Sequence, residues 1–305
     1  MHPDTPKPSI LTVPSWRQQF PWLWHGFSTR TGGVSAAYSS HVRPCDLNLG
    51  MTAEDDPVRV RENRQRLVEQ ASGSRMTPLL LIRQVHSGAS VILRRDQPLW
   101  SEAPQADGSL SDQPGILLAV QTADCIPVLV ADVEQRVAAA FHAGWRGTVQ
   151  RIVEQGVATM KAEFGSKPQH LVAAIGPGIG PCCYAVGNDL VAQFAGHFSY
   201  SAQLFRTTTE GALSLDLVEA NRRQLLSTGI NPEQIVALGG CTCCQPERFF
   251  SHRGQHGKTG RMMSVIGIAA SGPFVGSVIR GDPQHPPWRK AIFTRNSPAN
   301  SPSNR

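Results

Sequence analysis

The sequence predicts an α/β protein, and three observations support that class. Short apolar runs typical of buried strands recur in the middle of the chain, at 116–121, 126–132 and 136–145. Stretches with helical spacing of apolar residues lie on either side of them, at 57–72 and 148–164. A chain of 305 residues, 40% of them hydrophobic, can bury a full core in one large domain or two ordinary ones.

The N-terminal part is predicted to be a flexible extension followed by a strand and a long loop. Residues 1–15 are rich in proline, and we expect them to be frayed. Residues 22–40 begin as a strand and enter a turn at Gly32, which indicates either a surface hairpin or a flexible wall over a cleft. The loop ends in a tight element around Asn48, a candidate substrate contact.

A helix is predicted over 57–72. Asp55 and Asp56 provide an acidic cap, and Pro57 follows in the first turn, where its missing N–H is tolerated. The arginines of this helix are expected mostly on a solvated face. Arg64 can instead turn inward toward an anion, so it is a second candidate substrate contact.

The central strands deliver a cysteine and a histidine to strand ends or bends. Cys125 follows the break after 116–121, and His142 lies near the end of the run at 136–145. An apolar run ending in a polar break also precedes His86. A lone buried cysteine is usually a small core residue, but a cysteine with two histidines is a zinc ligand set that leaves a fourth position open. We therefore predict a catalytic zinc site, provided that the three residues converge in space.

The segment after His142 is predicted to form a helix over 148–164 that ends at Gly165. Its first N–H groups, near residues 144–148, lack partners within the helix, and Arg146 lies beside them. A phosphate or carboxylate group would be well placed there.

The C-terminal third is predicted to contain further strands and helices. A strand and a glycine-rich loop cover 171–187, without the pattern of a nucleotide phosphate-binding loop. The remaining expectations are a helix through 190–198 capped by Asn188 and Asp189, a helix over 217–229, a strand at 233–240, and a hairpin between 249–253 and 261–269. Arg253 and Arg261 are either surface charges or substrate contacts. Residues 16–271 would form the catalytic domain, and 272–305 a disordered basic tail rich in proline, serine and asparagine.

Composition restricts the classes of partner. The formal net charge is +6, but +4 of it lies from residue 272 onward, so the basic balance is weak support for nucleic acid binding. No apolar run reaches membrane-spanning length and no signal peptide is recognisable, so we expect a cytoplasmic protein.

The seven cysteines are expected to be thiols. The pair Cys182-Cys183 and the CTCC segment lack the two-pair spacing of a zinc ribbon, which argues against a structural metal.

Eight separated motifs resemble those of one protein family. They are QVHS, ADG, TADC, FHAGWRGT, IGPGIGPCCY, CTCC, FFSHR and TGRM. The chain resembles the YfiH-like proteins, described as laccase-domain or multicopper polyphenol oxidases, purine nucleoside phosphorylases and peptidoglycan editing factors. This resemblance covers roughly Phe20 to Ala270. It implies a single-domain layered α/β sandwich of mixed β-sheets, distantly similar to a toxin cysteine-hydrolase domain, with His86, Cys125 and His142 as metal ligands.

Zinc suits this ligand set better than copper. A multicopper cluster needs many imidazoles, commonly as His-x-His pairs, and none of the ten histidines here is two residues from another. We therefore expect Zn²⁺ rather than copper, and we discount polyphenol oxidase activity.

The resemblance implies phosphorolysis of adenosine, inosine, guanosine or methylthioadenosine, with adenosine deamination as a second activity. The expected partners are a small nucleoside and phosphate, with no nucleic acid and no membrane. Two alternatives remain open: Cys125 as the nucleophile of a hydrolase, including an amide hydrolase that removes L-serine from a peptidoglycan precursor, or an interaction protein with a relic metal site. The sequence carries no signal for the oligomeric state.

Overall fold

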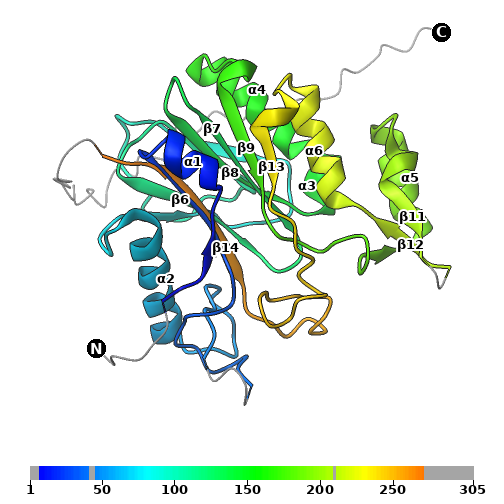
Figure 1. Cartoon of the computed structure of the whole chain (residues 1–305), viewed down its shortest axis with the longest axis horizontal. Helices are drawn as coiled ribbons and strands as arrows, with labels where there is room; N and C mark the ends of the chain where they lie inside the picture. Colours follow the sequence, from blue (N-terminus) through cyan, green and yellow to red (C-terminus); the bar gives the residue numbers. More distant parts are fainter. Residues whose placement is uncertain (1–6, 41–44, 209–210, 271–305) are drawn as a thin grey trace, which may run out of the picture. The chain divides into compact units, whose positions relative to one another are not determined.

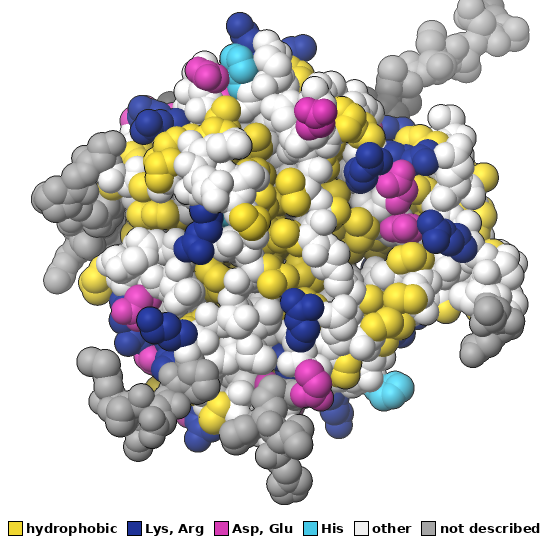
Figure 2. Space-filling model, in the orientation of Figure 1, with side chains coloured by type: hydrophobic (Ala, Val, Ile, Leu, Met, Phe, Trp, Pro, Cys, Tyr) yellow, Lys and Arg dark blue, Asp and Glu magenta, His cyan; other side chains and the backbone are white. Residues whose placement is uncertain are grey.

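The computed structural model describes residues 7–40, 45–208 and 211–270. The described residues belong to one compact unit, and they form two large β-sheets, a small third sheet and flanking helices (Figure 1). The predicted mixed α/β class is confirmed. Among the described residues, every helix is too short or too polar to cross a bilayer. On the face drawn in Figure 2, basic side chains lie scattered among acidic and apolar ones.

Each element is bounded as follows. The helices are α1 (Pro14–Gln19), α2 (Pro57–Ser72), α3 (Trp145–Val149), α4 (Ile152–Phe164), α5 (Asn188–His197) and α6 (Leu217–Ser227), with 3₁₀ turns at Pro168–His170, Ser201–Leu204 and Pro232–Gln234. The strands are β1 (Ile10–Leu11), β2 (Leu23–Ser28), β3 (Leu79–Leu81), β4 (Ser90–Leu93), β5 (Gly108–Ser111), β6 (Ile116–Thr122), β7 (Ile126–Asp132), β8 (Val137–Ala143), β9 (Leu171–Ile175), β10 (Ala185–Val186), β11 (Phe205–Thr207), β12 (Leu213–Leu215), β13 (Ile235–Ala237) and β14 (Met262–Ile268).

Both large sheets are mixed. The five-stranded sheet has the order β1-β2-β14-β6-β3 and is antiparallel except for the β3–β6 pair. The six-stranded sheet has the order β13-β9-β7-β8-β5-β4, with parallel pairs at its two edges and antiparallel pairs between them. The small antiparallel sheet has the order β10-β12-β11.

The two large sheets stack face to face, and helices cover their outer faces. Because side chains alternate along a strand, β7 sends Val128 toward the helices and Leu129 toward the other sheet. In β6, Leu118 faces the six-stranded sheet, whereas Leu117 packs with Leu67 of α2. The apolar residues of α4 and α6 belong to the same core cluster as Val128. The result is a four-layer sandwich in which both sheets are buried on both faces, which explains their nearly continuous apolar strands.

Several predicted elements are confirmed. Helix α2 covers 57–72, and the Asp56 side chain accepts a hydrogen bond from the N–H of Val58 at 2.8 Å. Strand β7 covers 126–132 as predicted. Gly165 ends α4 in a left-handed conformation, with a φ of 69°.

The helix predicted over 148–164 is wrong in its first part. The chain forms α3 from residue 145, breaks at Arg151, which has a φ of 59°, and resumes as α4. After the break, α4 packs on β8, where Gly156 lies so close to the ring of Phe141 that a Cβ atom would meet it at 2.2 Å. Local helical spacing carries no signal for such a turn, because sheet packing imposes it.

Three other expectations are corrected. Residues 249–253 form no strand, and β14 pairs with β2 and β6 rather than in a hairpin. Asn188 and Asp189 lie in the first turn of α5, and Gly187 takes the cap position. The frayed segment expected at 1–15 extends too far, because β1 pairs with β2 and Val13 is buried. The predicted tail at 272–305 lies outside the described residues.

Candidate metal site

The three predicted metal ligands meet in space. His86 follows β3, Cys125 lies between β6 and β7, and His142 is near the end of β8. One ligand atom from each lies within 4.8 Å of the other two. The two imidazole rings are 4.9 Å apart between centroids and meet edge to face. His142 is buried and His86 is exposed, so the cluster is open to solvent on the His86 side.

A buried carboxylate, Asp107, positions both histidines. Its Oδ1 atom lies 2.8 Å from Nδ1 of His142, and it accepts the backbone N–H of His86 at 3.0 Å. Its Oδ2 atom accepts the N–H groups of Val85 and Ser87 and the Ser87 hydroxyl. With Nδ1 of His142 held by the carboxylate, Nε2 is left to serve as a metal ligand.

Two of the ligand-bearing turns have a strained backbone. His86 has a φ of 59°, and Asp124, just before Cys125, has a φ of 94°. Asp107 holds the first turn, as described above. The second turn is held by its own carboxylate, because Asp124 accepts a hydrogen bond from the Thr242 hydroxyl at 2.6 Å and from the N–H of Arg253 at 2.7 Å. Buried side chains therefore stabilise the backbone conformations that direct His86 and Cys125 toward each other.

Close packing leaves no space for a side chain at residue 144, beside the cluster. A Cβ atom on Gly144 would lie 2.9 Å from Sγ of Cys125 and 3.3 Å from Cδ2 of His86. Gln84 forms two hydrogen bonds with the backbone of Gln121, at 2.7 and 2.8 Å, and so joins the segments before His86 and Cys125.

The cluster changes the acidity of its members. Burial raises the pKa of the Cys125 thiol, but the charge of His142 and hydrogen bonds from His142 and His86 outweigh burial and lower that pKa to about 6. Burial lowers the pKa of His142, but the Cys125 thiolate and Asp107 outweigh it and raise that pKa to about 9. Burial also raises the pKa of Asp107, yet hydrogen bonds from His142 and Ser87 bring it down to about 2. At neutral pH the metal-free site thus holds a thiolate beside an imidazolium.

The donor set and its supports fit a zinc ion. Two imidazoles and a thiolate are borderline-soft ligands of the kind that zinc prefers, and three protein ligands leave one position for an oxygen ligand. The Asp107–His142 hydrogen bond is the outer-shell contact typical of metal-bound histidine. His86, Cys125 and His142 would hold the ion.

Two of the predicted substrate contacts lie near the cluster. Arg146 is exposed, and its guanidinium lies over the ring of Trp145. Arg253 is also exposed, and its guanidinium lies 5.3 Å from the ring centroid of Tyr184. Burial raises the pKa of Tyr184 to about 12; the charge of Cys125 raises it further, and the charges of Arg253 and Arg146 lower it.

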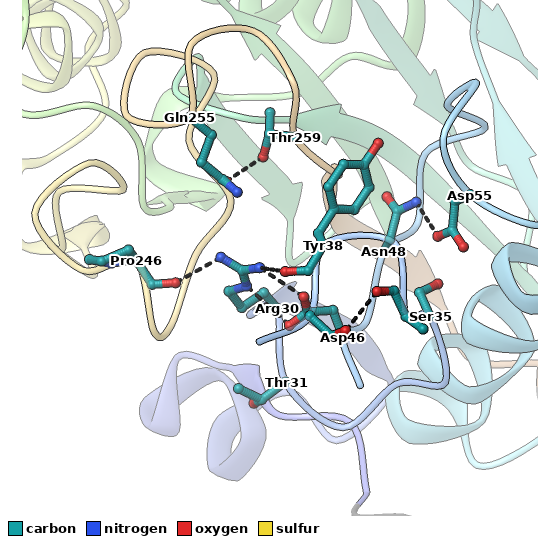
Figure 3. A network of polar contacts seen from close by, with 12 residues as sticks. Arg30, Thr31, Ser35, Tyr38, Asp46, Asn48, Asp55, Pro246, Gln255 and Thr259 are labelled. Carbon is teal, nitrogen blue, oxygen red and sulfur yellow. Dashed lines mark hydrogen bonds and ion pairs between the residues drawn. The ribbon is translucent and has the colours of Figure 1, made fainter. Parts of the chain in front are cut away.

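The other two predicted substrate contacts, Asn48 and Arg64, make hydrogen bonds within the chain. Asn48 is fully buried, and its Nδ2 donates to Asp55 (Figure 3). Nδ2 also donates to the Gly50 carbonyl, while Oδ1 accepts the N–H groups of Gly50 and Arg261. Both polar atoms of Asn48 are therefore already in use within the described chain. The Nε atom of Arg64 donates to the carbonyl of Leu49 at 2.8 Å. The tight element around Asn48 is confirmed, and its role is to hold this loop.

The same loop region contains a buried ion pair that joins distant segments. Arg30 and Asp46 are both buried and form two hydrogen bonds, at 2.8 and 3.1 Å. Arg30 also donates to the carbonyls of Tyr38 and Pro246, so it connects the loop after β2 with the one that precedes β14 (Figure 3). This ion pair therefore joins segments from both ends of the domain.

Sequence reasoning missed the two aspartates. Asp107 lies in the motif ADG and Asp124 in the motif TADC, but the sequence alone assigned neither residue to the site. One feature of the sequence could have indicated them: each aspartate lies within a few residues of a strand end, and Asp124 directly precedes the predicted ligand Cys125. Only the structure shows that Asp107 faces His86 and His142.

The fold of this chain is a layered α/β sandwich, and its site is a histidine–cysteine–histidine cluster. Together they indicate a candidate metalloprotein. The family model described as multi-copper polyphenol oxidoreductase laccase matches residues 24–269. The chain belongs to this family, whose members include the YfiH and YlmD proteins.

Relatives and solved structures agree with this assignment. A purine nucleoside phosphorylase of Deinococcus radiodurans is 40% identical over 245 residues, covering 80% of this chain and 88% of that protein. The purine nucleoside phosphorylase YfiH of Escherichia coli is 36% identical, covering 85% and 98%. The crystal structure of a hypothetical YfiH protein from Bacillus licheniformis superposes with a TM-score of 0.76 at 32% identity, covering 86% of this chain and 97% of that one.

Proposed function

We propose that this chain is a zinc-dependent purine nucleoside phosphorylase that acts on adenosine, inosine, guanosine or methylthioadenosine, with adenosine deamination as a side activity. The observation that carries the proposal is the cluster of His86, Cys125 and His142, buttressed by Asp107, in a chain whose relatives are named purine nucleoside phosphorylases.

The residues divide the work between metal binding and anion binding. His86, Cys125 and His142 would hold the ion. Asp107 would keep the ring of His142 oriented, and its carboxylate would partly offset the positive charge of the ion. A zinc ion held there would supply a Lewis acid that polarises an oxygen ligand and lowers its pKa.

Phosphorolysis needs an oriented anion, because the sugar carbon becomes positively charged as its bond to the base breaks. Arg146 and Arg253 are exposed cations, one just after the strand that carries His142 and the other bonded through its N–H to Asp124 beside Cys125, and they would attract phosphate to the site. An oxygen of hydrogen phosphate forms the new bond to the sugar carbon, the bond to the base nitrogen breaks, and the base leaves with the proton that hydrogen phosphate gives up.

The decisive experiment follows adenosine with and without phosphate. The zinc-loaded protein should release adenine and ribose 1-phosphate only when phosphate is present, and inosine should form slowly in both cases. His142→Ala should abolish both activities because it removes a ligand. Equal adenine release without phosphate would identify a hydrolase and contradict the proposal.

A second experiment tests the anion site. Arg146→Ala should raise the KM for phosphate several-fold while the zinc content stays unchanged, because the arginine is exposed and outside the ligand cluster. Arg206→Ala, which removes an exposed arginine of β11, is the matched control and should leave KM unaltered. Identical effects of the two substitutions would exclude a specific role for Arg146.

A second candidate function is amide hydrolysis with Cys125 as the nucleophile. It is favoured by the lowered pKa of the Cys125 thiol beside His142. On this alternative, metal-free protein should turn over an amide substrate and lose activity rapidly with iodoacetamide. Under the zinc proposal, metal-free protein is inactive before iodoacetamide is added.

A further inference from the structure

Four cysteines from two separate loops form a second cluster, which shares no residue with the His86 cluster. Cys182 and Cys183 lie in the loop between β9 and β10, and Cys241 and Cys244 lie in the loop after β13. The four sulfur atoms all lie within 4.8 Å of one another. The Sγ atom of Cys244 is 3.3 Å from Sγ of both Cys182 and Cys183.

The sequence argued against a metal here, because the cysteines lack the two-pair spacing of a zinc ribbon. The fold replaces that spacing: β9 and β13 are parallel neighbours, so the loops that follow them leave the same edge of the sheet. A bridge between Gly178 and Cys241 continues this pairing into the loops. Only one half, Cys241 and Cys244, shows the Cys-x-x-Cys spacing common in zinc sites.

We propose that Cys182, Cys183, Cys241 and Cys244 bind a structural zinc ion, distinct from the ion of the histidine–cysteine–histidine site. Four thiolates around zinc, at a Zn–S distance of about 2.3 Å, have their sulfur atoms about 3.8 Å apart. The separations here, from 3.3 Å to at most 4.8 Å, bracket that value. Four thiolates this close repel one another, and a divalent cation removes that repulsion. On binding, each thiol loses its proton to solvent and forms a Zn–S bond, without oxidation of sulfur.

The backbone also prepares one of the thiolates. The N–H of Gly180 donates to Sγ of Cys241 at 3.3 Å. Such N–H···S contacts stabilise negative charge on a metal-bound sulfur. Gly180 is close enough to the cluster that a Cβ atom there would lie 3.3 Å from Sγ of Cys182.

The proposed ion would stabilise the first site indirectly. Thr242 lies between two cluster cysteines, and its hydroxyl donates to Asp124 at 2.6 Å, beside Cys125. Its N–H donates to the carbonyl of Gly178. Fixing the two loops together would therefore hold Thr242 against the strained turn that presents Cys125.

Metal stoichiometry tests the proposal. Reduced, purified wild-type protein should contain two zinc ions per chain, one for each cluster. The double variant Cys241→Ser/Cys244→Ser should retain only the ion of the histidine–cysteine–histidine site. His142→Ala should retain only the ion of the four-cysteine cluster. Cys243→Ser is the matched control: it changes the neighbouring cysteine, outside the cluster of four, and should keep both ions. A wild-type protein with a single zinc, removed by His142→Ala, would overturn the proposal.

Cobalt spectroscopy on folded protein keeps the test valid if the double variant does not fold. Cobalt-loaded Cys125→Ala should still show strong thiolate-to-cobalt charge-transfer absorption, because four thiolates remain in the second cluster. Loss of that absorption in Cys125→Ala would contradict a tetrathiolate site.

Alkylation of unreduced, metal-stripped protein should modify all four cysteines, and resistance to alkylation would show disulfides instead. Bound copper in place of zinc would refute the proposed metal identity.

Discussion

Asp107 illustrates what a single buried carboxylate does at the residue scale. It accepts hydrogen bonds from three successive backbone N–H groups around His86, and it contacts the ring of His142. One side chain therefore fixes a strained turn and the tautomer of a ligand at once. This arrangement explains why His86 can be exposed and still be held in place.

Asp107→Asn should weaken zinc binding by about 10- to 100-fold, the usual range for loss of an outer-shell partner. The asparagine amide would place N–H groups opposite donors that now face an oxygen. Competition with a chromophoric chelator would measure the change. Asp96→Asn, at an exposed site, is the control and should bind zinc as the wild type does. Equal zinc affinities for Asp107→Asn and wild type would show that Asp107 does not contribute to zinc binding.

The ionisation of the cluster predicts a pH dependence of metal binding. The pKa of His142 is raised to about 9 and that of Cys125 is lowered to about 6, so His142 is protonated and Cys125 is not at neutral pH. Zinc must displace the His142 proton, so affinity should rise roughly tenfold per pH unit from neutrality toward about 9 and then level off. Chelator competition across this range, repeated with His142→Ala, would check the slope, and a flat profile in the wild type would contradict it.

At the scale of elements, the junction between β8 and α3 brings the backbone against the cluster. Gly144 follows β8 directly and caps α3, with Cys125 packed on its Cα. A residue with a side chain cannot occupy this position unless Cys125 or His86 moves.

Gly144→Ala should therefore reduce zinc content and lower the melting temperature. Its Cβ atom would lie 2.9 Å from Sγ of Cys125, well inside contact distance. Gly196→Ala in α5 is a matched control, because a Cβ atom there meets nothing within 4 Å and alanine favours a helix. Calorimetry and metal analysis of the two variants would separate them. An intact zinc content in Gly144→Ala would show that the site can expand.

At the scale of the whole molecule, stacking of the two large sheets makes the site possible. Cys125 lies in the short connection from β6, in the five-stranded sheet, to β7, in the six-stranded sheet. His86 follows an edge strand of the first sheet, and His142 belongs to the second. Any change in how the sheets stack would separate the ligands, so the metal should also stabilise the sandwich.

All of these site residues lie within the unit Met1–Pro273. A chain ending at Pro273 should therefore keep the melting temperature, zinc content and phosphorolysis of the full-length protein. Calorimetry and the phosphate-dependent adenosine assay would measure this. Loss of turnover in the shortened chain would show that the proposed division at residue 272 is misplaced.

Local patterns were sufficient for much of the fold. Helix α2 and strand β7 follow directly from capping residues and apolar runs, which act between near neighbours in the sequence. The break at Arg151 and the pairing of β14 with β2 and β6 depend on contacts between distant segments, so local patterns predicted a continuous helix and a hairpin instead.

For the site, the sequence by itself determined the residue types: two histidines and one cysteine at strand ends, in motifs that mark the family. Only the tertiary structure decided that Asp107 and Asp124 hold the ligand-bearing turns. It also decided that the Asn48 amide bonds within its own loop and that four cysteines converge. The physical reason is that ligand chemistry belongs to individual side chains, whereas distance and burial arise only when two sheets stack and bring their connecting loops together.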